Sequence, residues 1–131
     1  MQGIIDRVTR WAAGHTDVVG LLLVGSFARS AARPDSDVDL VMLTRDIAQY
    51  ADDSWADQLE LGDLVRIQRW GVVTERRFVT PSGLEVEINI GSHDWATTNP
   101  VDPGTRRVVS DGAVPLHDPE GMLAHLVRVC A

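Results

Sequence analysis

The chain has 131 residues, of which 44% are hydrophobic and 24% charged, and its formal net charge is −7. This length and composition predict one globular domain, 1–131, that can bury a core, and the acidic balance disfavours a general nucleic-acid-binding protein. All 12 basic residues are arginine, which excludes a Walker A lysine and lysine Schiff-base chemistry.

In the first part of the chain, helical and strand patterns alternate over short distances. The predicted elements are a helix at 3–14, a buried strand at 18–24, a short helix at 26–32, a turn at 34–36 and a second strand at 37–43. The strand VVGLLLV is apolar throughout, and Ser26 is the expected N-cap of the helix that follows it. The second strand is apolar on both faces after Asp39, which is typical of the middle of a covered sheet.

The rest of the chain continues the alternation. The predicted elements are an acidic helix and loop at 46–63, strands at 72–79 and 84–90, a helix at 103–110, a short strand at 113–116 and a helix at 119–129. Pro81 and Gly83 suit a type I turn between the two strands. Each of the last two helices begins with an Asp-Pro pair, which is typical of an N-cap followed by the first helical residue. We therefore expect an α/β (α+β) layer structure, a mixed β-sheet flanked by helices.

Two aspartates stand unusually close together where the second strand begins. Asp37 and Asp39 are two residues apart, so in a strand both side chains lie on the same face, about 6.5–7 Å apart. Two partly desolvated carboxylates repel each other, and a divalent cation relieves the repulsion. Hard oxygen ligands of this kind suit Mg²⁺, which commonly binds one or two carboxylates together with substrate phosphates.

The Gly25-Ser26 pair predicts an anion site beside these acids. A strand that ends in glycine and opens a helix presents backbone N–H groups to an anion, and the serine hydroxyl adds a donor. Ten residues separate Ser26 from Asp37, so the two strand ends can be neighbours. A phosphate site next to a metal site is the geometry for a nucleoside triphosphate.

A third acid is expected from the segment GLEVEINIG. It places Glu85 and Glu87 on one strand face and apolar residues on the other. Three carboxylates suffice for a pair of cations that bridge the attacking and leaving oxygens of a phosphoryl or nucleotidyl transfer. We favour Glu87, because Glu85 lies nearer the turn and is easier to solvate, but both remain candidates.

The segment GSFARSAARPDSDVDL, followed by an acid between apolar residues on a later strand, resembles the first motif of the polymerase-beta-like nucleotidyltransferase superfamily. The similarity is strongest to the minimal nucleotidyltransferases and weaker to the aminoglycoside nucleotidyltransferases. It implies the nucleotidyltransferase fold and transfer of a nucleoside monophosphate, with AMP from ATP as the first candidate, to a hydroxyl group. The implied cofactor is Mg²⁺, as two ions.

The same resemblance implies a role for each residue of the motif. Gly25 and Ser26 would hold the triphosphate. Asp37 and Asp39 would bind Mg²⁺, and Glu87 would be the third carboxylate, which assists deprotonation of the acceptor hydroxyl.

Two arginines of the motif, Arg29 and Arg33, can reach phosphate oxygens from the predicted helix and turn. A solvated surface position is the alternative for both. Trp55, Trp70 and Trp95 are further candidates, for stacking on a base or an acceptor. The pair Arg106 and Arg107 fits either a solvated helix face or a phosphate or partner site.

The acceptor is not identified by any motif. The aminoglycoside enzymes carry an added helical domain, whereas this chain has only the helices at 103–110 and 119–129. The acceptor site is therefore expected from a second subunit, a partner protein or a local pocket, so homo- or hetero-oligomers are possible. Some minimal members are antitoxins that modify or bind a helical HEPN-type toxin, which gives an alternative function as a binding partner. A nucleotide binder without activity is a third possibility.

The expected location is the cytoplasm, without membrane contact. No apolar run approaches the roughly 18 residues that a membrane span needs. The first 15 residues have polar side chains at helical spacing and do not resemble a signal peptide. The single cysteine, Cys130, has no disulfide partner in the chain.

Overall fold

Six strands form one sheet in the computed structural model, which describes residues 2–33 and 36–131. The strands are β1 (Val18–Val24), β2 (Val38–Thr44), β3 (Asp63–Trp70), β4 (Val73–Val79), β5 (Glu85–Ser92) and β6 (Ala113–His117). Their order is β3-β4-β5-β2-β1-β6. Strands β2 and β5 are parallel and the other neighbours are antiparallel, which confirms the mixed sheet.

Helices of different length flank the sheet. The α-helices are α1 (Gln2–Ala13), α2 (Gly25–Ala28), α3 (Ser54–Asp57), α4 (Pro103–Ser110) and α5 (Met122–Cys130), and two 3-10 helices are η1 (Ile47–Tyr50) and η2 (His93–Ala96). None of the helices within the described ranges, 2–33 and 36–131, is long and apolar enough to cross a membrane.

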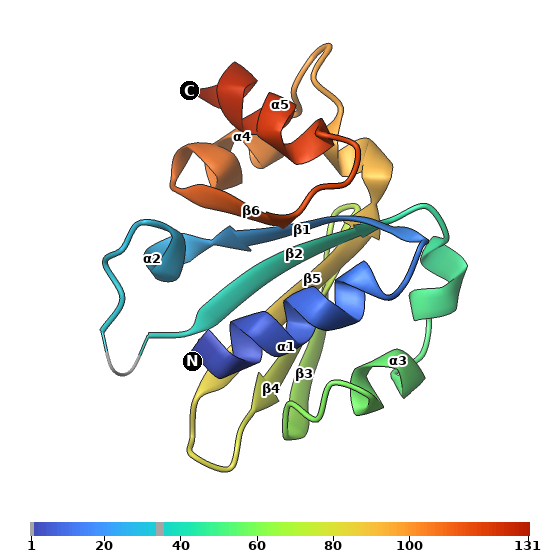
Figure 1. The fold of residues 1–131 in the computed structure, drawn as a ribbon, viewed down its shortest axis with the longest axis vertical. Helices are drawn as coiled ribbons and strands as arrows, with labels where there is room; N and C mark the ends of the chain where they lie inside the picture. The colour runs from blue at the N-terminus through green and yellow to red at the C-terminus, as the bar shows by residue number, and fades with distance from the viewer. Residues whose placement is uncertain (1, 34–35) are drawn as a thin grey trace.

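One face of the sheet packs against α1, which lies across the strands (Figure 1). Ile5 and Val8 are buried because the apolar residues of α1 recur at helical spacing. They join alternate residues of β2 and β5 and the rings of Tyr50 and Trp55 in one core. This core contains the side chains of β2 and β5 that point toward α1.

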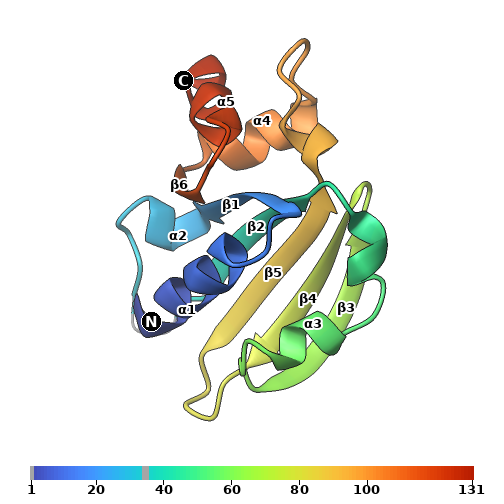
Figure 2. The same ribbon diagram turned by 45° about the vertical axis from the view of Figure 1, so that its right-hand side comes forward.

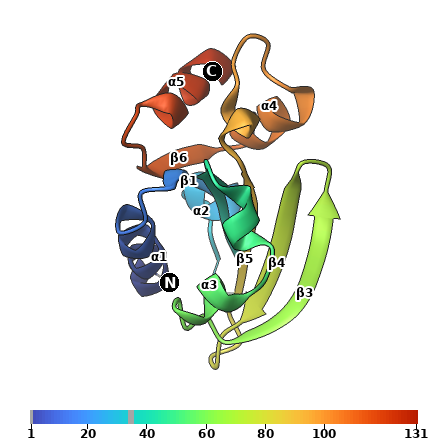
Figure 3. The same ribbon diagram turned by 90° about the vertical axis from the view of Figure 1, so that its right-hand side faces the viewer.

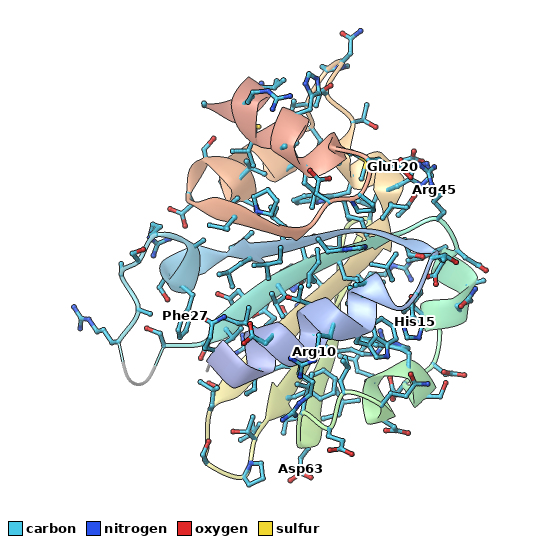
Figure 4. All side chains as sticks on the ribbon, viewed as in Figure 1. Arg10, His15, Phe27, Arg45, Asp63 and Glu120 are labelled. Atoms are coloured by element: carbon cyan, nitrogen blue, oxygen red, sulfur yellow. The ribbon has the colours of Figure 1, made fainter. Side chains whose placement is uncertain are left out.

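A second core lies on the opposite face, where α4 and α5 pack at the β1–β6 end of the sheet (Figure 2). Leu123 and Leu126 of α5 are fully buried against β1. A Cβ atom on Gly20 of β1 would lie 3.0 Å from Leu123 Cδ1, so the glycine lets α5 approach the strand. Arg45 after β2 pairs with Glu120 before α5 (Figure 4). The β3–β4 hairpin lies to one side of α4 and α5 (Figure 3), and residues of the hairpin and of α4 line the same two hollows.

Several predicted boundaries are confirmed. The first strand coincides with β1, and all its residues are buried. Helix α4 begins after Asp102, whose carboxylate accepts hydrogen bonds from the amides of Gly104 and Thr105. The predicted start of the last helix is wrong: α5 begins at Met122, three residues later, and its N-cap is Gly121 and not Asp118, although the Asp118 carboxylate accepts hydrogen bonds from the amides of Leu123 and Ala124.

The prediction for Ser26 as a helix N-cap is wrong. Helix α2 starts at Gly25, directly after the strand, so Val24 is the N-cap and no side chain caps the helix. Gly25 turns the chain with a φ of 74°, which places Ser26 inside the first turn. The helix ends at Ala28 instead of 32. Pro34 and Asp35 of the predicted turn lie outside the described residues.

Strand β3 was not expected. The segment predicted as an acidic helix and loop forms the short helices η1 and α3, and β3 follows. Most β3 residues are exposed, because the strand is at the edge of the sheet and pairs with β4 alone. An edge strand with little burial has no long apolar run by which the sequence could reveal it.

Candidate active site

The register of the central strands brings the predicted acids together. Asp39 of β2 and Glu87 of β5 are direct partners in the parallel pair. Asp37 lies two residues before Asp39, on the same side of the chain. The intervening Val38 and the next residue, Leu40, instead enter the α1-side core. We call the opposite side of these strands the site face.

Gly25 lies directly against this acid pair, since its neighbour Val24 is paired with Asp39. Its φ of 74° is in the left-handed region. A Cβ atom at this position would lie 2.6 Å from Asp39 Oδ2. Only glycine satisfies both conditions. Phe27 packs against the α1-side core and so anchors α2 beside the turn (Figure 4).

A guanidinium group, that of Arg77 on β4, lies among the acids. Its Nη1 is 3.0 Å from Asp37 Oδ2 and its Nη2 is 2.7 Å from Glu87 Oε2. Arg77 is directly opposite Glu87 in the antiparallel β4–β5 pair. No local pattern distinguishes Arg77 in the sequence, because TERRF is only a charged strand and the pairing between strands is not local information.

Glu75 is a fourth acid on the site face, two residues before Arg77 on β4. It is buried, and it accepts hydrogen bonds from Arg66 Nε at 3.0 Å and from Trp70 Nε1 at 2.7 Å. Burial raises the pKa of Glu75, but these donors outweigh burial and hold it below its ordinary value. The ionised Glu75 therefore fixes the half-exposed indole of Trp70 at the end of β3.

The electrostatic environment opposes ionisation of the two central acids. Burial, followed by the charge of Asp37, raises the pKa of Asp39 to about 6. Burial, together with Glu75 and Asp39, raises the pKa of Glu87 to about 7. Arg77 lowers both values and does not fully offset the other groups. The site face thus has more negative charge than its own cations neutralise.

The residues fit a divalent cation by chemistry. Within residues 2–33 and 36–131, no three His, Cys, Asp or Glu side chains form a ready metal-ligand group. The Arg77 guanidinium contacts two of the three candidate ligands instead. Carboxylate oxygens are nevertheless the ligands that Mg²⁺ prefers, and the raised pKa values of Asp39 and Glu87 mark the excess charge that a cation would relieve.

A cleft of about 670 Å³ opens onto these residues. Gly25, Asp39 and Glu87 line one part of it, and Trp70, Trp95 and Arg107 line another. A second hollow of about 670 Å³ adjoins it and shares both tryptophans. The cleft can therefore hold a ligand that is larger than a phosphate group.

Other sequence candidates have different positions. Arg29 donates to the Asp111 carboxylate at 2.8 Å and thereby links α2 to the end of α4. Arg33 is exposed, and its backbone amide bonds to Ser36 Oγ at 2.7 Å. Trp55 is buried in the α1-side core, which is incompatible with stacking on a ligand.

Glu87 fits the third carboxylate position better than Glu85 does. Its side chain is 18% exposed, against 43% for Glu85. It is also Glu87 that stands beside Asp39, whereas Glu85 is paired with Val79 at the start of β5.

A family model described as "Nucleotidyltransferase domain" matches residues 6–90, more than half of the chain. The matched segment includes Gly25, Asp37, Asp39, Arg77 and Glu87 and ends within β5. Helices α4 and α5 lie beyond it. No curated protein is significantly similar to the chain.

Two solved structures are among those that match the chain. The polymerase core of TRAMP, an RNA surveillance complex, is 23% identical with a TM-score of 0.45, over 67% of this chain and 28% of that chain. The Thermotoga maritima CCA-adding enzyme complexed with tRNA is 14% identical with a TM-score of 0.49, over 93% of this chain and 30% of that chain. The chain thus spans less than a third of the length of either.

Proposed function

The chain belongs to the nucleotidyltransferase domain family, and from that premise we propose that it transfers a nucleoside monophosphate from a nucleoside triphosphate, with ATP as the first candidate, to a hydroxyl group. The observation that carries the proposal is the register of β2 and β5, which sets Asp39 beside Glu87. Asp37 shares their face, and Gly25 lies against Asp39.

In this proposal Asp37, Asp39 and Glu87 hold Mg²⁺, as two ions. Bound there, Mg²⁺ would neutralise phosphate charge and polarise the α-phosphate. The Gly25-Ser26 turn receives the triphosphate, since a glycine without a side chain lets an anion approach the backbone.

Three arginines are candidates for contacts with the triphosphate. Arg107 lines the cleft and brings a positive charge to it from α4. Arg29 and Arg33 remain candidates from the motif, although Arg29 would first have to leave Asp111. We rank Arg107 first because it needs no such exchange.

The reaction is an in-line displacement at the α-phosphorus. The acceptor oxygen forms a bond to the α-phosphorus, the bond from that phosphorus to the α–β bridging oxygen breaks, and pyrophosphate leaves with the bonding electrons. The acceptor proton passes to a carboxylate. Glu87 is the candidate, because it lies beside Asp39 and lines the cleft where the acceptor would approach. Most of the acceleration comes from positioning and charge stabilisation.

The acceptor is a hydroxyl of a partner protein or of a small molecule such as an aminoglycoside. Support comes from the hollow next to the cleft, whose walls include Trp70, Trp95 and Val72. Apolar and aromatic walls suit an organic group better than a phosphate backbone. The net charge of −7 also opposes RNA as an acceptor.

To test the proposal, purified protein is incubated with α-³²P-labelled ATP, GTP, CTP or UTP, Mg²⁺ and acceptors that include an aminoglycoside, a tRNA and a co-expressed partner. We expect Mg²⁺-dependent transfer from one triphosphate, and loss of transfer in Asp37→Asn and Asp39→Asn. Asp63→Asn is the matched control, since Asp63 begins β3 at the end away from Trp70 (Figure 4). Equal transfer by wild type and both site variants would refute the proposal.

A second candidate function is that of a binding partner for a HEPN-type helical protein, without turnover. It is favoured by exposed apolar side chains on the β3–β4 hairpin, namely Val65, Ile67, Trp70 and Val72. Co-purification with the product of a neighbouring gene tests it, and Ile67→Glu should abolish the complex. Binding of ATP–Mg²⁺ in calorimetry with no pyrophosphate release would instead indicate an inactive nucleotide binder.

A further inference from the structure

The Arg77 guanidinium lies close to four acidic side chains. Besides its bonds to Asp37 and Glu87, its Nη1 is 3.4 Å from Glu85 Oε1 and its Nε is 3.9 Å from Glu75 Oε2. Among the residues that the structure describes, Arg77 is the one basic residue whose side-chain nitrogens lie within 4.0 Å of the carboxylate oxygens of Asp37 and Glu87. One guanidinium therefore lies within 4.0 Å of four carboxylates, of which Glu75 is also paired with Arg66.

The environment of Arg77 distinguishes it from a solvent-exposed ion pair. Its side chain is 19% exposed. The Nε atom is buried and has no hydrogen-bond partner, so the group is held by its ion pairs with Asp37 and Glu87. Exposed pairs contribute little to stability, whereas removal of one partner of a buried pair leaves an uncompensated charge.

The same oxygens are the candidate ligands of a divalent cation. A metal ion at an Asp37 or Glu87 oxygen would stand within a few ångströms of the guanidinium, and two cations at that distance repel strongly in a partly desolvated site. A carboxylate has lone pairs for more than one partner, so the conflict is between the cations and not between bonds. Either the guanidinium moves or additional negative charge must arrive.

We propose that Arg77 is a resident counter-cation of the active site, which positions Asp37 and Glu87 in the metal-free protein and competes with a divalent cation for their oxygens. The inference rests on the proposed function, because it takes these carboxylates as metal ligands. A triphosphate supplies the negative charge that lets Arg77 and the metal coexist, so the metal binds more tightly with the nucleotide than alone.

The test measures Mn²⁺ binding to the nucleotide-free protein by the electron paramagnetic resonance signal of free Mn²⁺. Arg77→Met keeps the length of the side chain and removes its charge. The matched control is Arg66→Met, because Arg66 is opposite Arg77 on the next strand and pairs with Glu75. We expect Arg77→Met to bind Mn²⁺ roughly tenfold more tightly than wild type, within the usual range of coupling between two sites. Arg66→Met should bind as wild type does.

Thermal unfolding gives a second readout. In EDTA, Arg77→Met should unfold at a lower temperature than wild type, and saturating Mn²⁺ should remove most of the difference. If Arg77→Met does not fold, Arg77→Gln replaces it. Arg77→Lys keeps the charge and should bind Mn²⁺ with nearly wild-type affinity.

Unchanged or weaker Mn²⁺ binding by the neutral variants would overturn the inference, and so would an Arg77→Lys variant that behaves like Arg77→Met. The proposed function would stand in either case if wild type still transfers label in the presence of Mg²⁺. Absence of Mn²⁺ binding in both wild type and Arg77→Met would also overturn the inference, whereas the proposed function is refuted only if wild type fails to transfer label in the presence of Mg²⁺.

Discussion

The two faces of strands β2 and β5 have opposite chemical character. Toward α1 the strands present Val38, Leu40 and Ile88, which are completely buried in a continuous apolar core. Toward the cleft, residues that alternate with these are Asp39 and Glu87. One face gains stability from burial of apolar surface, whereas the other face buries like charges.

This difference indicates that the two faces of β2 and β5 have different roles. The α1 side holds the strands in register, and the register places the acids. The site face keeps carboxylates whose raised pKa values show that ionisation is disfavoured in the metal-free protein. Such strain is expected where the charges serve a ligand and not the fold.

Substitutions at the neighbouring residues Leu40 and Asp39, which lie on opposite faces, should have opposite effects. Leu40→Ala creates a cavity in the core and should lower the free energy of unfolding by about 2–5 kcal/mol, measured by urea denaturation. Asp39→Asn should leave the free energy of unfolding unchanged or increase it, yet reduce nucleotidyl transfer on the order of a hundredfold or more. Equal destabilisation by both variants would mean that the two faces do not differ in role.

The pH dependence of stability reports the cost of ionising the acids on the site face. Asp39 and Glu87 have folded-state pKa values of about 6 and 7, above the ordinary 3.8 and 4.5. The folded protein therefore holds more protons than the unfolded chain from about pH 4 to pH 7, and its stability decreases as the pH rises through this range. In EDTA we expect the unfolding temperature to decrease by roughly 10 °C between pH 5 and pH 8.

The variant Glu87→Gln is the control for this effect, because an amide does not titrate, and it should flatten the curve. The lowered pKa of Glu75 acts in the opposite direction, but only at pH values near and below its ordinary 4.5. A wild-type curve that is flat or rises from pH 5 to pH 8 would contradict the electrostatic account.

Gly25 has a left-handed backbone conformation and also lies against Asp39. Its replacement, compared with that of a glycine away from the site, separates the effect of backbone strain from the effect on the site. Gly25→Ala should lower stability by about 1–2 kcal/mol, since a side chain disfavours the left-handed region. It should also reduce transfer by about a hundredfold, as small displacements of catalytic groups do. Gly83→Ala is the matched control, with a φ of 87° and no atom near its Cβ. It should lower stability in the same way and leave transfer unchanged.

The smallest expected effect concerns α4. Arg107→Ala should weaken ATP–Mg²⁺ binding roughly tenfold, as loss of one charge-assisted contact does, measured by calorimetry. Its neighbour Arg106 is exposed and does not line the cleft, so Arg106→Ala should bind ATP–Mg²⁺ as wild type does. Equal binding by both variants would remove Arg107 from the nucleotide site.

Local patterns in the sequence were sufficient for much of the fold. The apolar run of β1 and the Asp102-Pro103 start of α4 depend on neighbouring residues, and both are confirmed. The alternation in β5 likewise placed Glu85 and Glu87 on one face. The N-cap prediction for Ser26 failed because the turn begins one residue earlier, at a glycine that can take a positive φ.

Features that depend on pairing between distant segments could not be predicted in this way. The edge strand β3 has no apolar run, so no local pattern predicts that Arg66 and Trp70 are neighbours of Glu75. Arg77 belongs to the site only because β4 pairs with β5 in one particular register. For the pair Arg106 and Arg107, the sequence left a solvated face and a phosphate site both open, and only the packing of α4 places Arg107 in the lining of the cleft.

In the proposed function, the acids of the site face hold a metal and a nucleotide at the expense of stability. The most direct measurement compares the unfolding temperatures of wild type and Asp39→Asn at pH 8, in EDTA and in Mg²⁺ with a non-hydrolysable ATP analogue. We expect Asp39→Asn to be at least as stable as wild type in EDTA, and wild type alone to gain stability from the ligands. A variant that is less stable in EDTA, or that gains as much as wild type, would contradict the account.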